Sequence, residues 1–470
     1  ALEGELNFDT DLIDKIDEEA ELVNKAFKYF KSAQINIETS VLLSGKNGSR
    51  EEEAYKNFIL AKKDLEKRLK KLTNELNIYL AKIYGKTPRN KNEYEHWLIT
   101  HQPFHWFAEF YEIINSGGFD VIIGNPPYIE YSKIQKQYKV LEYETLGCGN
   151  IYTFIIERSL KIANRLSGIG IIIPLSFCAG ERMIPIRNLT TNSFSQLHIV
   201  NFEIFPSKLF DGAFQRLSIV LGRKLVLEKT NFRKYISKLH RWYSVERDVL
   251  LDKIQFTNSI NNEILPLFFK THNEIHSAIY YKNTNSSINK RVNAYTLPYK
   301  TESFIYYQEA TNYWMKAICR IPFYKKNNNV TVPAHGRCLF LGNSKINSAI
   351  MALLNSSLFY TWYIGYSDGF HLSDNLVRNF PISDAIISNT ELVKLSKDLE
   401  KNIKKNSVMT TRNTKTDNIE IESLKMVSSK NILNEIDIIL AKHYGFTEEE
   451  LDFIINYDIK YRMGKELEEE

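Results

Sequence analysis

The fold is decided by the stretch Phe119-Asp120-Val121-Ile122-Ile123-Gly124-Asn125-Pro126-Pro127-Tyr128-Ile129. Its apolar run at positions 121–123 has no polar alternation, which predicts a short strand buried on both faces, as in the centre of a parallel sheet. Gly124 ends the strand, so Asn125 stands at its carboxyl end, the edge at which open α/β sheets bind ligands. Because prolines fix φ and restrict the residue before them, the following turn is expected to be rigid.

The four residues Asn125, Pro126, Pro127 and Tyr128 resemble the catalytic motif of DNA methyltransferases that use S-adenosylmethionine to modify the exocyclic N6 of adenine. The N6 lone pair is delocalised into the ring, so this chemistry needs fixed acceptors for the two N6 hydrogens. The resemblance implies that the Asn125 side-chain oxygen and the Pro126 carbonyl are those acceptors, and that they stabilise the positive charge developing on N6. It also implies that Tyr128 stacks on the adenine after it is flipped out of the duplex.

The residues before the motif strengthen this resemblance. Without them, a strand that ends in a Pro-Pro loop capped by a packed tyrosine explains the four residues equally well. Residues 102–129 resemble the approach to the motif in large adenine methyltransferases, namely type IIG restriction-modification enzymes and related phage-defence methyltransferases. The resemblance implies S-adenosylmethionine as the cofactor and double-stranded DNA as the partner.

Composition sets broader limits. A chain of 470 residues suggests about three domains. A net charge of +5 is compatible with binding to a polyanion but is too small to indicate it. The four cysteines form no CxxC pair, so neither a zinc site nor a disulfide framework is indicated, and a reducing cytoplasm fits. We expect neither a membrane span nor a secretory leader. The first residue is Ala rather than Met, which suggests a fragment.

The N-terminal region predicts a helical hairpin. Residues 8–34 and 51–84 are rich in Glu and Lys, and the second segment carries apolar residues at helical spacing. The polar residues 44–50 between them faintly resemble a phosphate loop, but their spacing is wrong and a solvated turn is the better interpretation. Paired lysines on these helices indicate a solvated face more often than a DNA track.

The segment after the motif predicts a βαβ unit and further elements of the same sheet. A helix from 150 to about 166, a break at 167–170 and an apolar strand at 171–174 follow in order. The later elements expected are a helix at 182–191, a strand at 198–205, and a hairpin of 217–222 with 225–227.

Several aromatic residues are candidates for the far side of the base. Residues 210–215 occupy the second base-contacting region of the resembled core, so Phe214 or Phe210 could stack on the flipped adenine. Core packing is the preferred interpretation for both. Tyr152 and Phe154 lie near the expected cofactor and base pocket, and packing explains them equally well.

The cofactor-binding half of such an enzyme is not recognisable. The resembled enzymes hold S-adenosylmethionine with a strand and a turn of the type Asp-Pro-x-x-Gly-x-Gly ahead of the motif, and residues 1–118 contain no match. The glycines at 146–150 and 168–170 follow the motif and lack the acidic residue. No nuclease site is recognisable either. We therefore expect a missing N-terminal region or a partner chain to supply the cofactor loop.

From about residue 233 the chain changes character, with short tyrosine-rich apolar segments between basic and Asn/Ser/Thr stretches. Residues 353–359 and 379–382 resemble TaqI-like specificity domains that read target DNA, and Lys, Arg, Asn and Tyr on loops suit phosphate and base-edge contacts. Residues 397–430 predict a helix and a mobile linker. A helix at 431–444 and a capping box at 447–450 follow.

We interpret the chain as an α/β protein with a partial Rossmann-like methyltransferase sheet, an N-terminal helical spacer and an α+β target-recognition domain. The expected function is a site-specific DNA adenine-N6 methyltransferase of a restriction-modification or phage-defence system. A DNA-binding specificity module without autonomous catalysis is the alternative, and a degenerate scaffold for protein contacts is a third. Target sequence, nuclease activity and oligomeric state stay open. The expected domains are a helical spacer at 1–100, the catalytic half of the methyltransferase at 101–235, target recognition at 236–395 and a C-terminal helical segment at 396–470.

Overall fold

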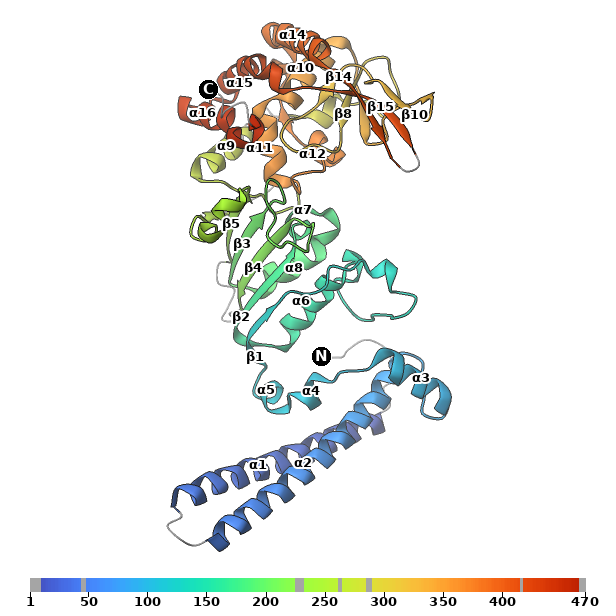
Figure 1. The fold of residues 1–470 in the computed structure, drawn as a ribbon, viewed down its shortest axis with the longest axis vertical. Coiled ribbons are helices and arrows are strands. Elements are labelled where there is room, and N and C mark those ends of the chain that lie inside the picture. Colours follow the sequence, from blue (N-terminus) through green and yellow to red (C-terminus); the bar gives the residue numbers. More distant parts are fainter. Residues whose placement is uncertain are drawn as a thin grey trace. The chain divides into compact units, whose positions relative to one another are not determined.

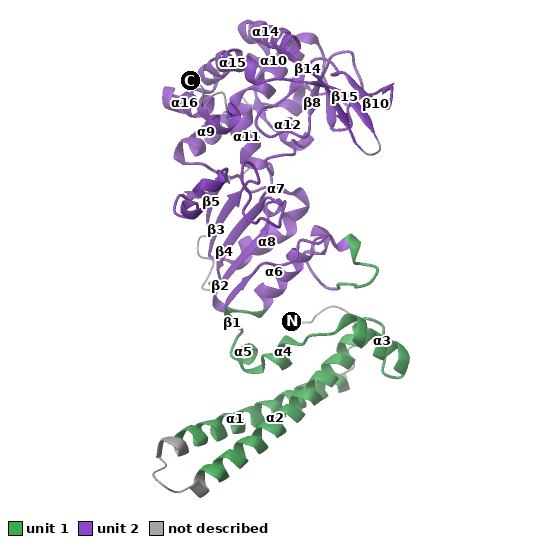
Figure 2. Ribbon diagram, viewed as in Figure 1, with its two compact units in different colours: residues 1–120, 132–140, 162–164 green, residues 121–131, 141–161, 165–470 purple. Residues whose placement is uncertain are grey.

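The chain divides into two compact units in this computed structural model (Figure 2). Unit 1 comprises residues 1–120, 132–140 and 162–164, and unit 2 comprises the remainder. The structure describes residues 10–43, 48–224, 232–260, 264–284, 290–414 and 417–464. The predicted turn at 44–47 and the predicted return strand at 225–227 lie outside the described residues.

Unit 1 is built on two long helices, α1 (Thr10–Leu43) and α2 (Gly48–Ile83), which form the predicted hairpin (Figure 1). The helices are antiparallel, because Lys71 pairs with Glu19 near one end and the Phe30 and Phe58 rings lie 5.3 Å apart nearer the other. Apolar residues at three- and four-residue spacing make one side of each helix the core-facing side. The buried core of the unit consists of Val23, Ala26, Leu65, Leu72, Ala108 and Tyr111.

Shorter helices complete unit 1: α3 (Lys91–His101), α4 (Trp106–Glu109) and α5 (Tyr111–Asn115). Residues 132–140, which come after the motif in sequence, also belong to this unit. The Tyr84 hydroxyl donates a 2.9 Å hydrogen bond to the Lys139 carbonyl, and the His101 and Tyr138 rings lie 5.4 Å apart. The loop that follows the motif is therefore anchored on the helical unit.

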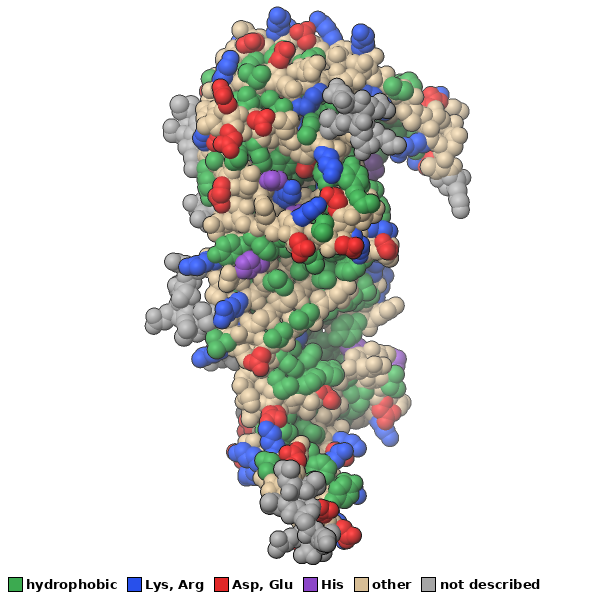
Figure 3. Space-filling model, turned by 60° about the vertical axis from the view of Figure 1, so that its left-hand side comes forward, with side chains coloured by type: hydrophobic (Ala, Val, Ile, Leu, Met, Phe, Trp, Pro, Cys, Tyr) green, Lys and Arg blue, Asp and Glu red, His purple; other side chains and the backbone are tan. Residues whose placement is uncertain are grey.

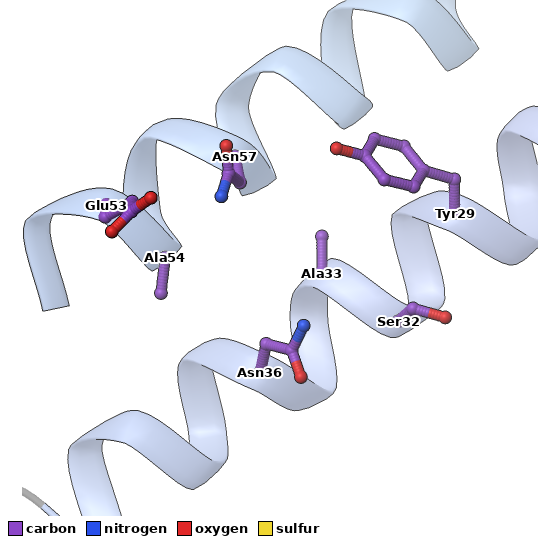
Figure 4. A pocket seen from close by; sticks show the side chains of 7 residues that line it. All are labelled: Tyr29, Ser32, Ala33, Asn36, Glu53, Ala54 and Asn57. Atoms are coloured by element: carbon purple, nitrogen blue, oxygen red, sulfur yellow. The ribbon is translucent and has the colours of Figure 1, made fainter. Parts of the chain in front are cut away.

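A cavity of about 350 Å³ lies between α1 and α2 (Figure 4). It is lined by small, polar and aromatic side chains and contains no residue of the Asn-Pro-Pro-Tyr motif. Its lining consists of Tyr29, Ser32, Ala33, Asn36, Glu53, Ala54 and Asn57.

A mixed sheet of six strands carries the motif, which confirms the predicted α/β class. The strands lie in the order β1-β2-β4-β3-β5-β6 (Figure 1). β4 is antiparallel to β2 and β3, β5 is parallel to β3, and β6 is antiparallel to β5. The bounds are β1 (Phe119–Gly124), β2 (Ala163–Pro174), β3 (Gln196–Phe202), β4 (Leu217–Arg223), β5 (Arg233–His240) and β6 (Thr257–Asn258).

The position of β1 corrects one prediction. The sequence predicted a central strand buried on both faces, but β1 is the first strand of the sheet and pairs only with β2 among the described residues. The Val121 and Ile123 side chains are 62% and 82% exposed. The apolar residue types of this run favour burial. In the described chain, however, no segment covers the Val121 and Ile123 side chains.

The connection from β1 to β2 follows the predicted βαβ order with different bounds. The helix α6 (Ile151–Ile162) ends earlier than predicted, and the expected break at 167–170 is part of β2. Residues from Gly168 onward pair with β4, so the ladder continues through both glycines. Strand β2 is followed by α7 (Ser176–Ala179) and by the predicted helix α8 (Ile184–Ser193), which has Pro185 in its first turn.

The C-terminal part of unit 2 is a mixture of helices and small antiparallel sheets. Helix α11 (Ser357–Tyr366) lies in its core, because all of its residues are buried. The other helices are α9 (Glu274–Thr284), α10 (Ser344–Asn355), α12 (Asp374–Arg378), α13 (Asp384–Ser388), α14 (Thr390–Asn406), α15 (Lys430–Tyr444), α16 (Glu448–Asn456) and α17 (Ile459–Arg462). One sheet has the order β12-β8-β9, with β8 (Phe304–Gln308), β9 (Ala317–Ile318) and β12 (Gly336–Phe340), and a two-stranded sheet pairs β7 (Lys290–Arg291) with β13 (Pro381–Ile382).

A second correction concerns residues 397–430, predicted as a helix and a mobile linker. The helix is present as the end of α14, but an antiparallel pair replaces the linker: β14 (Val408–Asn413) and β15 (Asn418–Ser423). They extend a sheet with β10 (Tyr324–Lys326) and β11 (Asn329–Val330). Acidic residues of β15 pair with basic residues near β10, including Glu422 with Arg320 and Glu420 with Lys325. These cross-strand charges explain how so polar a stretch forms a sheet.

A buried charged cluster joins the sheet to the C-terminal helices within unit 2. Glu203, just after β3, contacts Arg216 at 2.5 Å and Arg241 at 3.7 Å. Arg241 also lies 3.5 Å from Asp458, the residue before α17, and its carbonyl accepts a 2.6 Å hydrogen bond from Tyr461. Burial raises the pKa of Glu203, while the two arginines oppose that shift. This cluster fixes the ends of β3 and β5 against the C-terminal part.

Candidate active site at the end of strand β1

Asn125 stands immediately after β1, as predicted, and is exposed, whereas Pro126 is buried and Tyr128 is half-buried. The Tyr128 hydroxyl is within hydrogen-bonding reach of two acceptors, the Asn125 Oδ1 and the Ile172 carbonyl, the latter at 3.0 Å. A hydroxyl carries one hydrogen, so it donates to one of these oxygens at a time. The side chains of Asn125 and Tyr128 therefore lie together, and the asparagine oxygen has a local donor.

Burial raises the pKa of the Tyr128 hydroxyl above its ordinary value of 10.0. The hydroxyl consequently stays protonated at neutral pH and serves as a donor, not as a negative charge.

The register of the sheet places a second loop at the same edge. Pro174 at the carboxyl end of β2 pairs with Leu217 at the start of β4, and Leu217 also pairs with Phe202 at the end of β3. The loop at 203–216 therefore leaves the sheet where β2 ends. Because Tyr128 bonds to Ile172 near that end of β2, the motif and this loop share one edge of the sheet.

Phe214, the candidate for base stacking, lies in this second loop. Its side chain is 69% exposed, so the preferred prediction that it packs into the core is wrong. It contacts Phe205, which is 39% exposed, with ring centroids 5.6 Å apart and planes at 74°. Phe210 is partly buried. An exposed aromatic pair thus stands at the edge that carries the motif.

Tyr152 and Phe154, which the sequence left undecided, are both core residues. Tyr152 is fully buried, and its hydroxyl lies 3.2 Å from Ser176 Oγ and donates to Met183 Sδ at 3.1 Å. Burial raises the pKa of Tyr152. Phe154 is 5% exposed and packs against the rings of Tyr131 and Tyr143. Both side chains are therefore packed in the interior of unit 2.

The sequence reasoning missed the residues that close the loop after the motif. Ile129 accepts a 3.0 Å hydrogen bond from the Ile151 amide, and Tyr131 donates a 2.9 Å bond to the Gly149 carbonyl, so the loop's two ends meet beside Tyr128. The Glu130 carboxylate adds side-chain contacts, because Arg182 donates to both of its oxygens and Asn150 to one. Nothing in the local sequence pattern identifies these partners, which are 20 and 52 residues away.

A buried carboxylate holds the second half of the same loop. Glu157 on α6 is fully buried and accepts hydrogen bonds from the Glu144 amide and from the amide and hydroxyl of Thr145. Burial raises its pKa, but the hydrogen bonds from Lys161, Thr145 and Glu144 outweigh this, so the pKa is lowered overall. Glu157 therefore remains ionised and keeps the loop ordered.

Neither a metal-binding cluster nor a membrane-spanning helix is present in the described part of the chain. It contains no group of three or more His, Cys, Asp or Glu side chains arranged to hold a metal ion. Among its helices, none combines the length and the apolar character required to cross a membrane. The four cysteines are free thiols.

Comparison with known protein families gives one match. Residues 15–210, less than half of the chain, match the family described as Eco57I restriction-modification methylase. Two curated relatives carry the name of type II restriction enzyme and methyltransferase. The one from Methanocaldococcus jannaschii is 33% identical over 123 residues, 26% of this chain and 10% of the relative. RM.Eco57I from Escherichia coli is 22% identical over 236 residues, 45% of this chain and 23% of the relative. The matched segments thus span less than a quarter of either relative.

Solved structures give weaker likenesses. The Type IIL restriction-modification enzyme MmeI in complex with DNA has a TM-score of 0.38 at 10% identity, covering 77% of this chain and 58% of its own. A nuclease-deletion mutant of the Type ISP restriction-modification enzyme LlaGI with a DNA substrate mimic has a TM-score of 0.36 at 11% identity, covering 68% and 48%. At these TM-scores the likeness assigns nothing to this chain. The family match and the two relatives support a restriction-modification methylase, without bearing on the acceptor atom.

Proposed function

We propose that this chain supplies the methyl-acceptor half of a site-specific DNA adenine-N6 methyltransferase that uses S-adenosylmethionine in a restriction-modification or phage-defence system. The observation that carries the proposal is the exposed Asn125 at the carboxyl end of β1, with the Tyr128 hydroxyl on its side-chain oxygen. The match of residues 15–210 to a restriction-modification methylase family supports the same class of reaction.

In the proposed reaction, the N6 amino group of a flipped adenine donates one hydrogen to Asn125 Oδ1 and the other to the Pro126 carbonyl. These bonds draw the N6 lone pair out of conjugation, and the two oxygen dipoles stabilise the charge that develops on nitrogen. The Tyr128 ring supplies one stacking face, and the exposed Phe214 is the candidate for the other. When the base arrives, the Tyr128 hydroxyl transfers its hydrogen bond from Asn125 to the Ile172 carbonyl, which frees the asparagine oxygen.

The residues of this chain do not fit S-adenosylmethionine. The described elements ahead of β1 are the helices α1 to α5, and no strand with a glycine-rich turn and an acidic partner is among them. When bound, the cofactor supplies the methyl group, and we propose that a missing N-terminal region or a partner chain holds it. Strand β1 is suited to receive that part, because it is the first strand of the sheet and its Val121 and Ile123 side chains, which project to one face, are exposed. Full burial of each such side chain contributes about 1.5–3 kcal/mol.

We assign recognition of double-stranded DNA to residues 236–395 and retain 396–470 as a supporting segment, which contains the β14–β15 pair as well as helices. Exposed basic and aromatic side chains on loops, such as Tyr299 at 62% exposure and the neighbouring Lys300, support this assignment. Tyrosine and lysine on loops serve base contacts and phosphate contacts respectively. The alternative of a specificity module without catalysis is favoured by the lack of a recognisable cofactor loop, and it predicts the same DNA binding.

The experiment that separates the two functions identifies the product. The chain is supplied with a cofactor-binding half from a restriction-modification relative and incubated with duplex DNA and labelled S-adenosylmethionine, and the nucleosides are analysed by mass spectrometry. N6-methyladenine that disappears in Asn125→Ala supports the proposal. Methylation at a cytosine, or N6-methyladenine that survives Asn125→Ala, contradicts it. If the chain binds duplex DNA but no methylation is seen with any cofactor-binding half, the specificity module is favoured.

A further inference from the structure

Four lysines of α2 form a stripe on one side of the helix. Lys56, Lys63, Lys67 and Lys70 are all exposed and are spaced seven, four and three residues apart. Residues at these separations lie above one another on an α-helix. We call this set the lysine stripe.

The lysine stripe is on the side of α2 away from its partner helix. The buried residues Ala61, Leu65 and Leu72 face α1, and the stripe positions are out of phase with them by about half a turn. The helical positions within and after the stripe hold Leu60, which is 63% exposed, and Asn74, while the exposed Glu52, four residues before Lys56, lies at its N-terminal end. The four lysines therefore form a row on an outward surface, with Glu66 beside it, three residues after Lys63 and four before Lys70.

The stripe lysines differ from other basic residues of the same unit. Lys71 pairs with Glu19, Lys31 with Glu112, and Arg68 with Asp64. For Lys56, Lys63, Lys67 and Lys70, by contrast, the described residues include no ion-pair or hydrogen-bond partner. On the face of the molecule in Figure 3, Lys and Arg side chains are interspersed with Asp and Glu, which is the usual arrangement of a solvated surface.

A row of lysines without ion-pair partners lowers the stability of the helix. Like charges three or four residues apart, here Lys63 with Lys67 and Lys67 with Lys70, repel each other and destabilise a helix. None of these lysines packs into the core, which lies on the other side of the helix. A polyanion that binds the stripe would remove this repulsion and supply the partners.

We propose that the lysine stripe binds the phosphate backbone of duplex DNA, independently of sequence and in addition to the recognition assigned to residues 236–395. From Lys56 to Lys70 the helix rises about 21 Å along its axis. Duplex DNA presents one negative charge per about 1.7 Å, so about a dozen phosphates lie within that length. Lysine, a mobile point charge on a flexible stem, suits contacts that position DNA without reading bases. The choice of DNA as the ligand rests on the proposed function.

An anionic membrane is the other polyanion that a lysine-rich helix can bind. A helix that lies in a membrane interface buries an apolar face in the lipid. The apolar face of α2 is already occupied by α1, and Leu60 is a single exposed apolar residue among the lysines. These observations favour DNA.

The test measures how DNA binding by the full chain depends on salt. The variant Lys56→Gln/Lys63→Gln/Lys67→Gln/Lys70→Gln is compared with the parent and with a control, Lys25→Gln/Lys31→Gln/Lys71→Gln, that removes three lysines with acidic partners from the same hairpin. Binding to a fluorescent duplex without a target site is followed by anisotropy from about 50 to 200 mM salt.

Each lost phosphate contact reduces the slope of log K against log salt by about 0.9, so the stripe variant should lose about 3 to 4 units of slope. Over the fourfold salt range, the parent should lose roughly a hundredfold more affinity than the variant. The control should keep the parent slope. Circular dichroism should show that the variant hairpin is as stable as the parent or more stable, since the like-charge pairs are gone.

Equal slopes for the parent and the stripe variant, with both bound to DNA, would overturn the lysine stripe and leave the proposed function standing. Binding of the stripe to vesicles containing phosphatidylserine, combined with no effect on DNA, would also overturn it. A parent chain that binds no duplex at all would overturn both the stripe and the proposed function.

Discussion

The Tyr128 hydroxyl donates a hydrogen bond to the side-chain oxygen of Asn125. In the proposed reaction this oxygen is an acceptor for the adenine N6 hydrogens. Until a base arrives, it accepts a hydrogen bond from Tyr128 of the same motif. The second acceptor within reach, the Ile172 carbonyl at 3.0 Å, gives the hydroxyl an alternative partner. Without a bound base, the side-chain oxygen of Asn125 is therefore hydrogen-bonded to Tyr128. It becomes available when the Tyr128 hydroxyl donates to the Ile172 carbonyl instead.

This arrangement predicts opposite results for two substitutions at one position. Tyr128→Phe keeps the stacking ring and removes the bond that occupies Asn125, so capture of a flipped adenine should be unchanged or tighter. Tyr128→Ala removes a stacking face worth about 1–3 kcal/mol per base, so capture should weaken about tenfold or more. A fluorescent adenine analogue at the target position reports the flipped fraction. If both substitutions weaken capture equally, the Tyr128 hydroxyl contacts the bound adenine, and its bond to Asn125 in the site without a base is not its main role.

The glycine pair before β1 predicts a stability difference between two neighbouring positions. Gly117 and Gly118 both have φ of +109°, where an L side chain is strained. A Cβ at Gly118 would lie 2.3 Å from the Ile162 carbonyl oxygen, whereas a Cβ at Gly117 meets nothing within 4 Å. Gly117→Ala should therefore cost about 1–3 kcal/mol through backbone strain, and Gly118→Ala distinctly more. Denaturant unfolding of both variants measures the difference, and equal losses would rule out the contact.

A pH-dependent contact is predicted for His371 and Asp368, whose Nδ1 and Oδ2 lie 2.6 Å apart. The hydrogen bond to Asp368 raises the pKa of His371 above 6.5. Burial opposes ionisation of Asp368, but its bonds to His371 and to backbone amides lower its pKa to about 2. The stabilisation should be complete between about pH 4 and 6.5, lost as pH rises through the folded pKa of His371, and lost as pH falls toward 2. In an NMR titration, Asp368→Asn should lower the pKa of His371; an unchanged value would exclude the pairing.

The sequence predicted the helical hairpin, the α/β class and the place of Asn125 because these depend on local patterns: helical apolar spacing, and an apolar run ended by Gly124. The sequence wrongly predicted that β1 is a central, buried strand. A run of Val and Ile residues does not indicate whether a second neighbouring strand is present. The sequence also missed the β14–β15 pair, because the cross-strand charges that hold it, such as Glu422 with Arg320, join residues about a hundred positions apart.

At the site, the motif residues were identifiable from their order alone, while their supports were not. Glu157 and Arg182 act through loops that come together only in the folded chain. Phe214 was expected in the core because aromatic residues usually pack there, and its 69% exposure follows from its position on the loop between β3 and β4. The comparisons with known proteins do not bear on the roles of Asn125, Pro126, Pro127, Tyr128 and Phe214, which remain proposals.

The chain by itself should bind S-adenosylmethionine weakly or not at all, because the described residues offer no glycine-rich cofactor turn. Isothermal titration calorimetry of the full chain should show no saturable heat at micromolar concentrations. Addition of a cofactor-binding half should restore binding, and Val121→Lys or Ile123→Lys on the exposed face of β1 should prevent it, because a charge would be buried where the two parts meet. Tight binding by the unsupplemented chain would show that a cofactor site lies within it.

The most direct test of the account is the single-turnover rate of methyl transfer to adenine in the completed enzyme, compared between the parent and Asn125→Ala. Loss of one preorganised hydrogen-bonding group costs roughly 3 kcal/mol, so the rate should fall about a hundredfold or more while duplex affinity, which depends on other residues, is retained. Tyr128→Phe serves as the matched control that keeps Asn125 and should retain the rate. An Asn125→Ala enzyme that methylates adenine N6 at the parent rate would contradict the account.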